Sequence, residues 1–365
     1  MTQGGDARIV LDPQTRLNRY HSAPYPRDVL ALASSTANDL SAEAASWLLA
    51  KFGDRMDNLG NGSDYSDFLD ECRHSIRSAY ALSDDTDIFF APSGTDLEYV
   101  ALFATAGTAS AGISNLLLGA DEVGSGCIHS AAGCYFANET ALGASVEPGQ
   151  PVAGMAAIEM GDFPVRDALG TAFDGPSIAA QMWPKIAEAL SQSLHPLVHI
   201  VHGSKTGLVL PHLDAIEALI ARFGDKVSFV VDACQARITT PAIHDYLARG
   251  IIVFLTGSKF MGGPPFSGFA LLPQGMAAKA ATLPAGAAHI FRRAEVPLTW
   301  PGRETLEDSG NAGLALRLAA SLFELERFQS LSEAEVRRTV GAFTDATDRL
   351  AAELNVQKVG AAAPS

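Results

Sequence analysis

The sequence predicts an α/β protein with a mostly parallel sheet sandwiched between helices. Short apolar runs alternate with longer helical patterns from about residue 86 onward, which is typical of that class. Two runs, 227–231 and 251–255, are rich in Val, Ile and Phe, as in strands that are buried on both faces. The length of 365 residues favours two domains over one.

Seven runs are candidate strands, and helical patterns separate them. The strands are expected at 87–91, 115–119, 145–148 (a weak pattern), 197–201, 227–231, 251–255 and 268–272. Helices are expected at 43–52, 65–82, 95–107, 124–141, 178–194, 211–223, 241–248, 308–329 and 331–353. Residues 150–175 fit neither pattern and indicate an inserted hairpin or loop. We therefore expect an N-terminal segment at 1–60, a large domain at 61–290 and a small, incomplete C-terminal domain at 291–365.

Composition excludes several classes of protein. The formal net charge of −15 argues against a nucleic-acid partner, which would need a basic stripe. No apolar run approaches the ~20 residues of a membrane span, and the first residues lack the apolar region of a secretory signal. The four cysteines show no metal-site spacing and no disulfide framework, so we expect reduced thiols, no metal and a cytoplasmic location.

Polar residues follow the two most apolar strands, where an open sheet binds its ligands. Asp232 ends the first strand, with Gln235 three residues on, and Thr256, Ser258 and Lys259 follow the second. A half-buried lysine is a nucleophile toward carbonyls, and two hydroxyls beside it favour an anionic group such as a phosphate. The alternatives are a lysine that reaches solvent and an aspartate that caps the next helix.

Two further turns lie at the same predicted sheet edge. The Ser-Gly-Thr turn that contains Gly94 and Thr95 opens a helix, and backbone N–H groups at a helix N-terminus bind anions. Ser204 lies in a polar turn after strand 197–201. A simple helix cap and a plain turn explain these two features equally well in isolation. Together, however, a phosphate turn, an acid and a lysine in this order match a pyridoxal 5′-phosphate (PLP) site.

At these residues the sequence resembles the class V aminotransferase group of fold-type I PLP enzymes, which includes the cysteine desulfurases. The resemblance covers about residues 55–325 and is carried by the segments V-D-A-C-Q, T-G-S-K and S-G-T-D. It implies that Lys259 forms the Schiff base, that Asp232 binds the ring nitrogen and that Gln235 binds the 3-oxygen. The resemblance further implies a phosphate site made of the following residues: Gly94, Thr95, Thr256 and Ser258.

The resemblance also implies a homodimer. The segment that contains Thr305 is similar to one whose threonine reaches the phosphate of the partner subunit. Ser204 stands where family members often carry an asparagine near the 3-oxygen. Asn61 and Tyr65 lie where family members line the substrate entrance.

Three departures from the family pattern stand out. At the place of the ring-stacking side chain the sequence reads Glu-Val-Gly, so either Val123 or His129 would pack on the cofactor. No cysteine follows Cys234, which argues against persulfide transfer. The small domain that normally supplies an arginine for the substrate carboxylate is short.

The resulting hypothesis is a PLP-dependent enzyme that acts on an amino-acid-like amine through an external aldimine, by aminotransferase-type chemistry. One alternative is a β- or γ-lyase or a bond-forming replacement enzyme on the same scaffold. Another is a non-catalytic PLP-binding subunit. A nucleotide-binding protein is disfavoured because neither G-x-x-x-x-G-K-[ST] nor G-x-G-x-x-G occurs.

Overall fold

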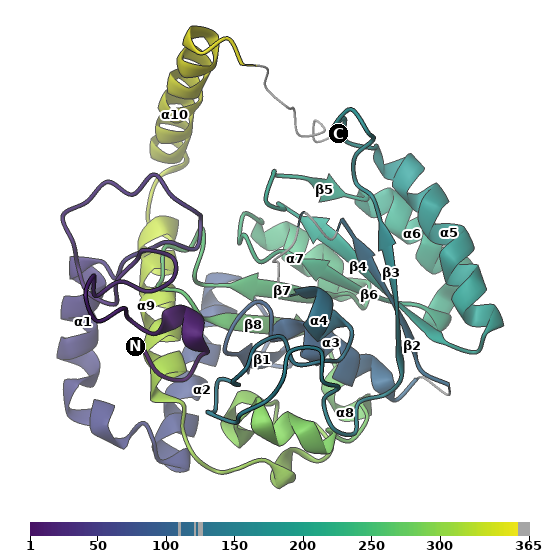
Figure 1. Cartoon of the computed structure of the whole chain (residues 1–365), viewed down its shortest axis with the longest axis horizontal. Coiled ribbons are helices and arrows are strands. Elements are labelled where there is room, and N and C mark those ends of the chain that lie inside the picture. Colours follow the sequence, from purple (N-terminus) through teal and green to yellow (C-terminus); the bar gives the residue numbers. More distant parts are fainter. Residues whose placement is uncertain (109–110, 120–121, 123–126, 357–365) are drawn as a thin grey trace.

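A computed structural model describes residues 1–108, 111–119, 122 and 127–356, and its centre is one mixed sheet (Figure 1). The strand order is β1-β8-β7-β6-β4-β2-β3, with β5 paired to β4. Strands β7, β6, β4, β2 and β3 pair in parallel, whereas β8 is antiparallel to both of its neighbours. The bounds are β1 (Asp87–Ala91), β2 (Ile113–Leu118), β3 (Ile158–Phe163), β4 (His195–His202), β5 (Val209–Leu210), β6 (Ser228–Asp232), β7 (Ile252–Thr256) and β8 (Gly268–Leu272). The prediction of a mostly parallel sheet sandwiched by helices is confirmed.

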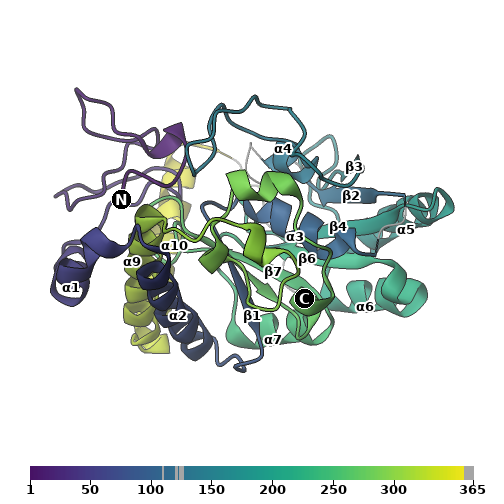
Figure 2. The ribbon, with the colours of Figure 1, turned by 90° about the horizontal axis from the view of Figure 1, so that it is seen from below.

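Helices cover both faces of this sheet (Figure 2). Helices α2, α5, α6, α7 and α9 pack on one face, and α3 with the chain after β8 packs on the other. The helices are α1 (Ala42–Phe52), α2 (Gly62–Ala79), α3 (Leu97–Ala106), α4 (Cys127–Ala131), α5 (Gly175–Ser191), α6 (Leu213–Phe223), α7 (Thr240–Ala248), α8 (Met276–Lys279), α9 (Ala312–Gln329) and α10 (Glu333–Glu353). Among the residues that the structure describes, no helix has the length and apolar character needed to cross a membrane.

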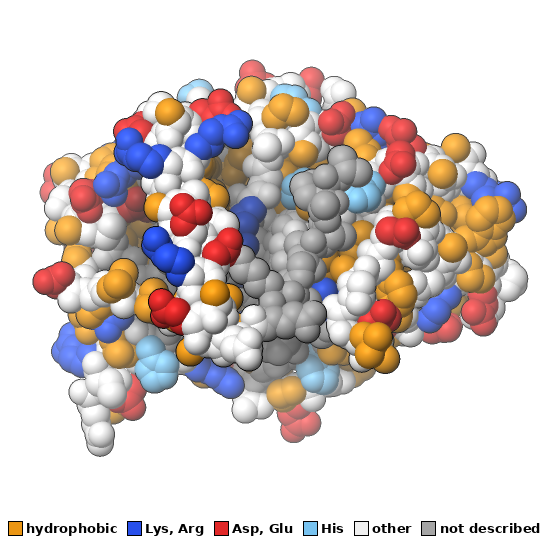
Figure 3. All heavy atoms as spheres, turned by 90° about the horizontal axis from the view of Figure 1, so that it is seen from above, with side chains coloured by type: hydrophobic (Ala, Val, Ile, Leu, Met, Phe, Trp, Pro, Cys, Tyr) orange, Lys and Arg blue, Asp and Glu red, His pale blue; other side chains and the backbone are white. Residues whose placement is uncertain are grey.

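The end of the chain differs from the body of the fold. Helix α9 packs against α1 and α2, whereas α10 projects away and buries none of its residues (Figure 1). Seen from the side from which α10 projects, basic and acidic side chains are interspersed over the surface (Figure 3). The core cluster beneath α2 also includes α9 residues, so one core spans the predicted boundary at residue 290. The proposed division at residues 60 and 290 stays a prediction.

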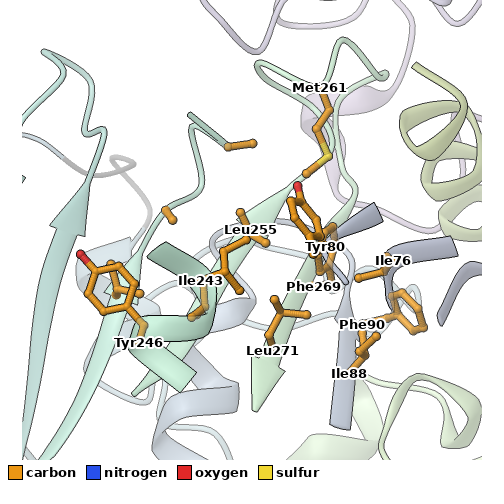
Figure 4. Close-up of a cluster of buried hydrophobic side chains, with 14 of the residues drawn as sticks. Ile76, Tyr80, Ile88, Phe90, Ile243, Tyr246, Leu255, Met261, Phe269 and Leu271 are labelled. Carbon is orange, nitrogen blue, oxygen red and sulfur yellow. The ribbon is translucent and has the colours of Figure 1, made fainter. Parts of the chain in front are cut away.

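The core alternates between the two sheet faces because successive strand side chains point in opposite directions. Phe90 and Leu271 face the α2 side, whereas Phe89 and Ala270 face the α3 side. Figure 4 shows the first of these clusters, with side chains of α2 and α7 lying against the strands. Its labelled members are Ile76, Tyr80, Ile88, Phe90, Ile243, Tyr246, Leu255, Met261, Phe269 and Leu271.

Three local predictions were wrong. The weak pattern at 145–148 forms no strand, and the parallel edge strand beside β2 is β3, inside the stretch expected to be an insertion. Strand β3 pairs with β2 at the sheet edge and buries only Phe163 fully, so it needs no apolar run. The helix expected at 124–141 ends early, at Ala131, because Gly133 adopts a φ of 70° and turns the chain; residues 124–126 lie outside the described residues.

Residues 1–41, here called the leading segment, run over the body without regular helix or strand apart from the short turn Ala7–Ile9. The fully buried guanidinium of Arg317, in α9, fastens it. Arg317 donates to the carbonyl oxygens of Met1, Gln3 and Gly4, each at 2.7 Å, and to that of Phe266, also at 2.7 Å. The leading segment is therefore tied to the loop before β8.

Candidate functional site

A cavity of about 310 Å³ opens at the carboxyl ends of the parallel strands. Eight of the site residues predicted from the sequence line it: Gly94, Thr95, Ser204, Asp232, Gln235, Thr256, Ser258 and Lys259. They come from turns after β1 and β4 and from the ends of β6 and β7. Since these strands share one direction, the sheet itself brings the residues together.

Asp232 and Lys259 are held by their backbone surroundings. Asp232 ends β6, and one carboxylate oxygen accepts the N–H of Cys234 at 2.8 Å. Lys259 follows β7, and the side-chain amide of Asn38 donates to the carbonyl oxygens of Ser258 (3.2 Å) and Lys259 (2.9 Å). The ammonium of Lys259 forms no ion pair with any residue that the structure describes. A lysine that is fixed at its backbone and unpaired at its amine suits nucleophilic chemistry.

The turn between β1 and α3 presents free donors. Ser93 donates its hydroxyl to Asp96 at 2.6 Å and accepts the N–H of Asp96 at 3.3 Å, which closes the turn. The N–H groups of Gly94 and Thr95 make no hydrogen bond to a described residue. A Cβ atom at Gly94 would lie 3.0 Å from a methyl group of Thr256, so the turn packs closely on β7. This geometry suits an anion at the start of α3.

The two hydroxyls near Lys259 differ in availability. Thr256 donates its hydroxyl to the carbonyl oxygen of Cys234 at 2.6 Å, so it offers a ligand only its lone pairs. Ser258 is 5% exposed, and its hydroxyl has no partner among the described residues. Ser258 is therefore the better donor to an anion in the cavity.

Glu122 is a cavity residue whose role the sequence did not reveal. It accepts hydrogen bonds from the hydroxyl of Ser204 at 2.6 Å and from the N–H and hydroxyl of Thr206 at 3.1 and 2.8 Å. The Nε atom of Arg166 lies 3.4 Å away. Burial opposes ionisation of Glu122, but these donors outweigh it and lower its pKa. The hydroxyl of Ser204 is thus already engaged.

A buried acid–imidazole pair, which the sequence also did not reveal, lies close to Asp232. Oε2 of Glu98, in α3, is 3.4 Å from Nδ1 of His199, in β4, and both side chains are almost fully buried. Burial, reinforced by the charge of Asp232, raises the pKa of Glu98 well above its usual value. Burial lowers the pKa of His199 to about 3. Both shifts favour the uncharged forms of these two side chains.

Three predicted residues do not line the cavity. Thr305 is exposed in a short 3-10 helix and donates its hydroxyl to the carbonyl of Gly302 at 2.7 Å. Asn61 caps α2, and Tyr65 is fully buried with its hydroxyl donating to Glu295 at 2.8 Å. The structure thus gives Asn61 and Tyr65 structural partners, and a role of Thr305 in a partner subunit stays a prediction.

Of the two candidates for stacking on a cofactor, Val123 lies outside the described residues, and His129 is exposed in α4, away from the cavity lining. The leading segment, in contrast, supplies cavity residues that no motif indicated. These are Arg8, Tyr20 and residues 34–36. Their placement depends on contacts across more than 200 residues of sequence, such as that of Asn38 with Lys259.

No family model matches the chain, and no curated protein matches its sequence. Solved structures do match. An apo cysteine desulfurase from Thermococcus onnurineus NA1 gives a TM-score of 0.52 at 16% identity, covering 87% of this chain and 72% of that one. The cystine C-S lyase C-DES, in complex with its product cysteine persulfide, gives 0.53 at 20% identity, covering 83% and 72%. The chain has the fold of fold-type I PLP enzymes.

A further match is weaker and carries no part of this assignment. A serine palmitoyltransferase from S. paucimobilis with a bound PLP–myriocin aldimine gives a TM-score of 0.46 at 13% identity, and the chain spans 57% of that protein's length. The two matches with TM-scores above 0.5, at 16% and 20% identity, establish the fold-type I architecture and not a reaction. The prediction of the fold made from the three sequence segments is confirmed.

Proposed function

We propose that this chain is a PLP-dependent enzyme that acts on an amino-acid-like amine, with Lys259 as the residue that binds the cofactor covalently. The observation that carries the proposal is the shared cavity of Lys259, Asp232 and the Gly94–Thr95 turn. An amine, an acid and a set of anion donors are the three groups that PLP requires of a protein. The fold-type I architecture supports the same assignment.

The cavity residues fit the cofactor group by group. The N–H groups of Gly94 and Thr95 and the hydroxyl of Ser258 would hold the phosphate. Asp232 would bind the ring nitrogen. Gln235 is 7% exposed and its buried Oε1 has no partner in the described part of the chain, which fits a ligand group at that point. The cavity volume is also that of a small-molecule site.

When bound, PLP supplies an electron sink for the carbanion that forms next to the substrate amine. The residues of the chain do the rest. Asp232 would bind the ring nitrogen and favour its protonated form, which would maintain that electron demand. The amine of Lys259, in the same cavity, would take and return the proton of the α-carbon. Asn38 keeps the backbone of Lys259 in place throughout.

The decisive test is the visible spectrum of the purified protein after incubation with PLP. We expect a yellow band that is absent in Lys259→Ala and retained in Lys205→Ala, a matched loss of another lysine of the same cavity. Borohydride reduction followed by peptide mass spectrometry should place the adduct on Lys259. A wild-type protein that stays colourless, or an adduct on another lysine, would refute the proposal.

For the reaction, we propose aminotransferase-type chemistry, and added 2-oxo acid tests it. A transaminase carries out half-reactions and accumulates a pyridoxamine form, whereas a β- or γ-lyase, or a replacement enzyme, turns over without the 2-oxo acid. A non-catalytic PLP-binding subunit would keep its yellow band whatever amine is added.

We also propose a homodimer in which Thr305 reaches the partner's phosphate site, supported by the exposure of this residue. Analytical ultracentrifugation tests it, and a monomeric holoprotein would contradict it.

A further inference from the structure

The proposed phosphate site has hydrogen-bond donors but no assigned cation. A phosphate carries up to two negative charges, and proteins usually meet them with an arginine or a lysine. Lys259 is committed to the covalent bond, and Lys205 lies between Ser204 and Thr206, whose side chains hydrogen-bond to Glu122. Arg8 is the remaining cation in the described lining of the cavity.

Arg8 lies at the same corner of the cavity as the Gly94–Thr95 turn. Its guanidinium is 4.7 Å from the ring centre of Phe266, which precedes β8. The start of β8 touches that turn, because a Cβ atom on Gly268 would lie 2.9 Å from the carbonyl oxygen of Ser93. Arg8 also interacts electrostatically with Asp96, the residue that caps α3 directly after the turn. The contact with Phe266 and the interaction with Asp96 therefore place Arg8 next to the start of α3.

The guanidinium of Arg8 is held in one orientation, with Nη1 available to bind a ligand. Nε and Nη2 donate to the carboxylate of Asp6 at 2.9 and 2.7 Å, and Asp6 is 4% exposed. The ring of Phe136 lies 5.2 Å from the guanidinium carbon, in addition to that of Phe266. Nη1 makes no hydrogen bond to a described residue. An arginine fixed in this way loses little freedom when it binds an oxyanion.

The leading segment that carries Arg8 is itself anchored on both sides of this residue. Before Arg8, the carbonyl of Gly4 accepts from Arg317 at 2.7 Å and from Asn311 at 3.2 Å. After it, Ile9 is buried, and much further on Asn38 bonds to the backbone of Lys259. Arg8 is thus delivered to the cavity by a segment that is fastened to the body of the fold.

We propose that Arg8 binds the phosphate of PLP, so that the leading segment completes the cofactor site. This inference rests on the proposed function, since it concerns the same cavity. The shared chemistry is oxyanion recognition, for which the substrate carboxylate is the other candidate. The contacts with the start of α3 favour the phosphate, because the free N–H groups of Gly94 and Thr95 lie there.

The test compares two aldehydes that differ only in the phosphate, PLP and pyridoxal. Their dissociation constants are measured from the visible band of the wild type, Arg8→Gln, Arg8→Lys and Arg19→Gln. Arg19 is a matched control, an exposed arginine of the same segment. We expect Arg8→Gln to weaken PLP binding about 10- to 100-fold, the range for a lost hydrogen bond between charged groups. Pyridoxal binding should change less than about twofold, Arg8→Lys should recover part of the loss, and Arg19→Gln should match the wild type.

Other results would overturn the inference. Equal weakening of both aldehydes would mean that Arg8 only supports the fold, and unchanged PLP binding would remove it from the phosphate site. In a third arm, L-alanine and ethylamine are titrated into PLP-loaded protein. If Arg8→Gln weakens only the amino acid, the residue binds the substrate carboxylate instead. Failure of the proposed function has a different signature, since the wild type would then form no band with either aldehyde.

Discussion

The buried Arg317 allows a sharp prediction about how the leading segment is held. Replacing it by Met keeps the volume of the side chain and removes all four of its hydrogen bonds to backbone carbonyl oxygens. Each such bond to a charged donor contributes ~1.5 to 3 kcal/mol, which gives ~6 to 12 kcal/mol for four. This gain is offset by the cost of burying the charge.

That cost can be worked from the pKa of Arg317. Burial lowers the pKa from 12.5 to about 9. At ~1.4 kcal/mol per pKa unit this difference corresponds to ~5 kcal/mol. Subtracting it from the gain leaves a net stabilisation of ~1 to 7 kcal/mol, and we expect Arg317→Met to lower the free energy of unfolding by about 4 kcal/mol.

Two assays measure this effect. Urea unfolding gives the loss of stability, and limited trypsin digestion followed by mass spectrometry reports on the leading segment, where Arg16 and Arg19 become cleavable once the segment detaches. Because Arg8 would leave the cavity as well, PLP affinity should fall in the same variant. Arg327→Met is the control, an arginine of the same helix whose side chain is 46% exposed. The reasoning is refuted if Arg317→Met unfolds at the wild-type urea concentration with an equally resistant leading segment.

Three further predictions concern single contacts. Burial raises the pKa of Asp96 from 3.8 to about 7, so between these pH values the native state keeps a proton that the unfolded state has released, and the wild type loses stability as pH rises. In urea unfolding, the stability of Asp96→Asn relative to the wild type should therefore rise by up to ~4 kcal/mol between pH 4 and 8, and parallel pH curves would contradict this. Tyr65→Phe removes the hydrogen bond to Glu295 and should cost ~1 to 2 kcal/mol of stability in the same assay without changing KM, whereas a raised KM would return Tyr65 to the substrate site. Gly310→Ala places a Cβ atom 1.8 Å from the carbonyl oxygen of Leu59 and should lower the melting temperature by an amount equivalent to ~3 kcal/mol, an idea that an unchanged melting temperature would exclude.

The central strands were predictable because strands buried on both faces consist almost entirely of apolar residues. Strands β6 and β7 lie between neighbours and under helices on both faces, so they are apolar nearly throughout. Strand β3 lies at the edge of the sheet and tolerates Glu159 and Asp162, so its sequence carries no such signal. Parallel pairing then explains why residues at strand ends, such as Asp232, were correctly expected to share one cavity.

The rest of the site depends on contacts that no local pattern encodes. Asn38 reaches the carbonyl of a residue 221 positions later in the chain, and Arg8 reaches the cavity only because Arg317 anchors the segment before it. Tyr65 was expected at the substrate entrance from its position in the sequence, but its side chain points into the core toward Glu295. A motif fixes where a residue lies along an element, and packing decides which way its side chain turns.

The hydrogen bonds from Asn38 also bear on how fast the lysine can move. With its backbone carbonyl held at 2.9 Å, Lys259 keeps mainly the rotations about its own side-chain bonds. Such rotations take picoseconds to nanoseconds, whereas a typical enzyme needs about a tenth of a second for each turnover. In the proposed enzyme, travel of the ammonium between cofactor and substrate would therefore be too quick to limit the rate. A slower event, such as product release, would then set the turnover rate.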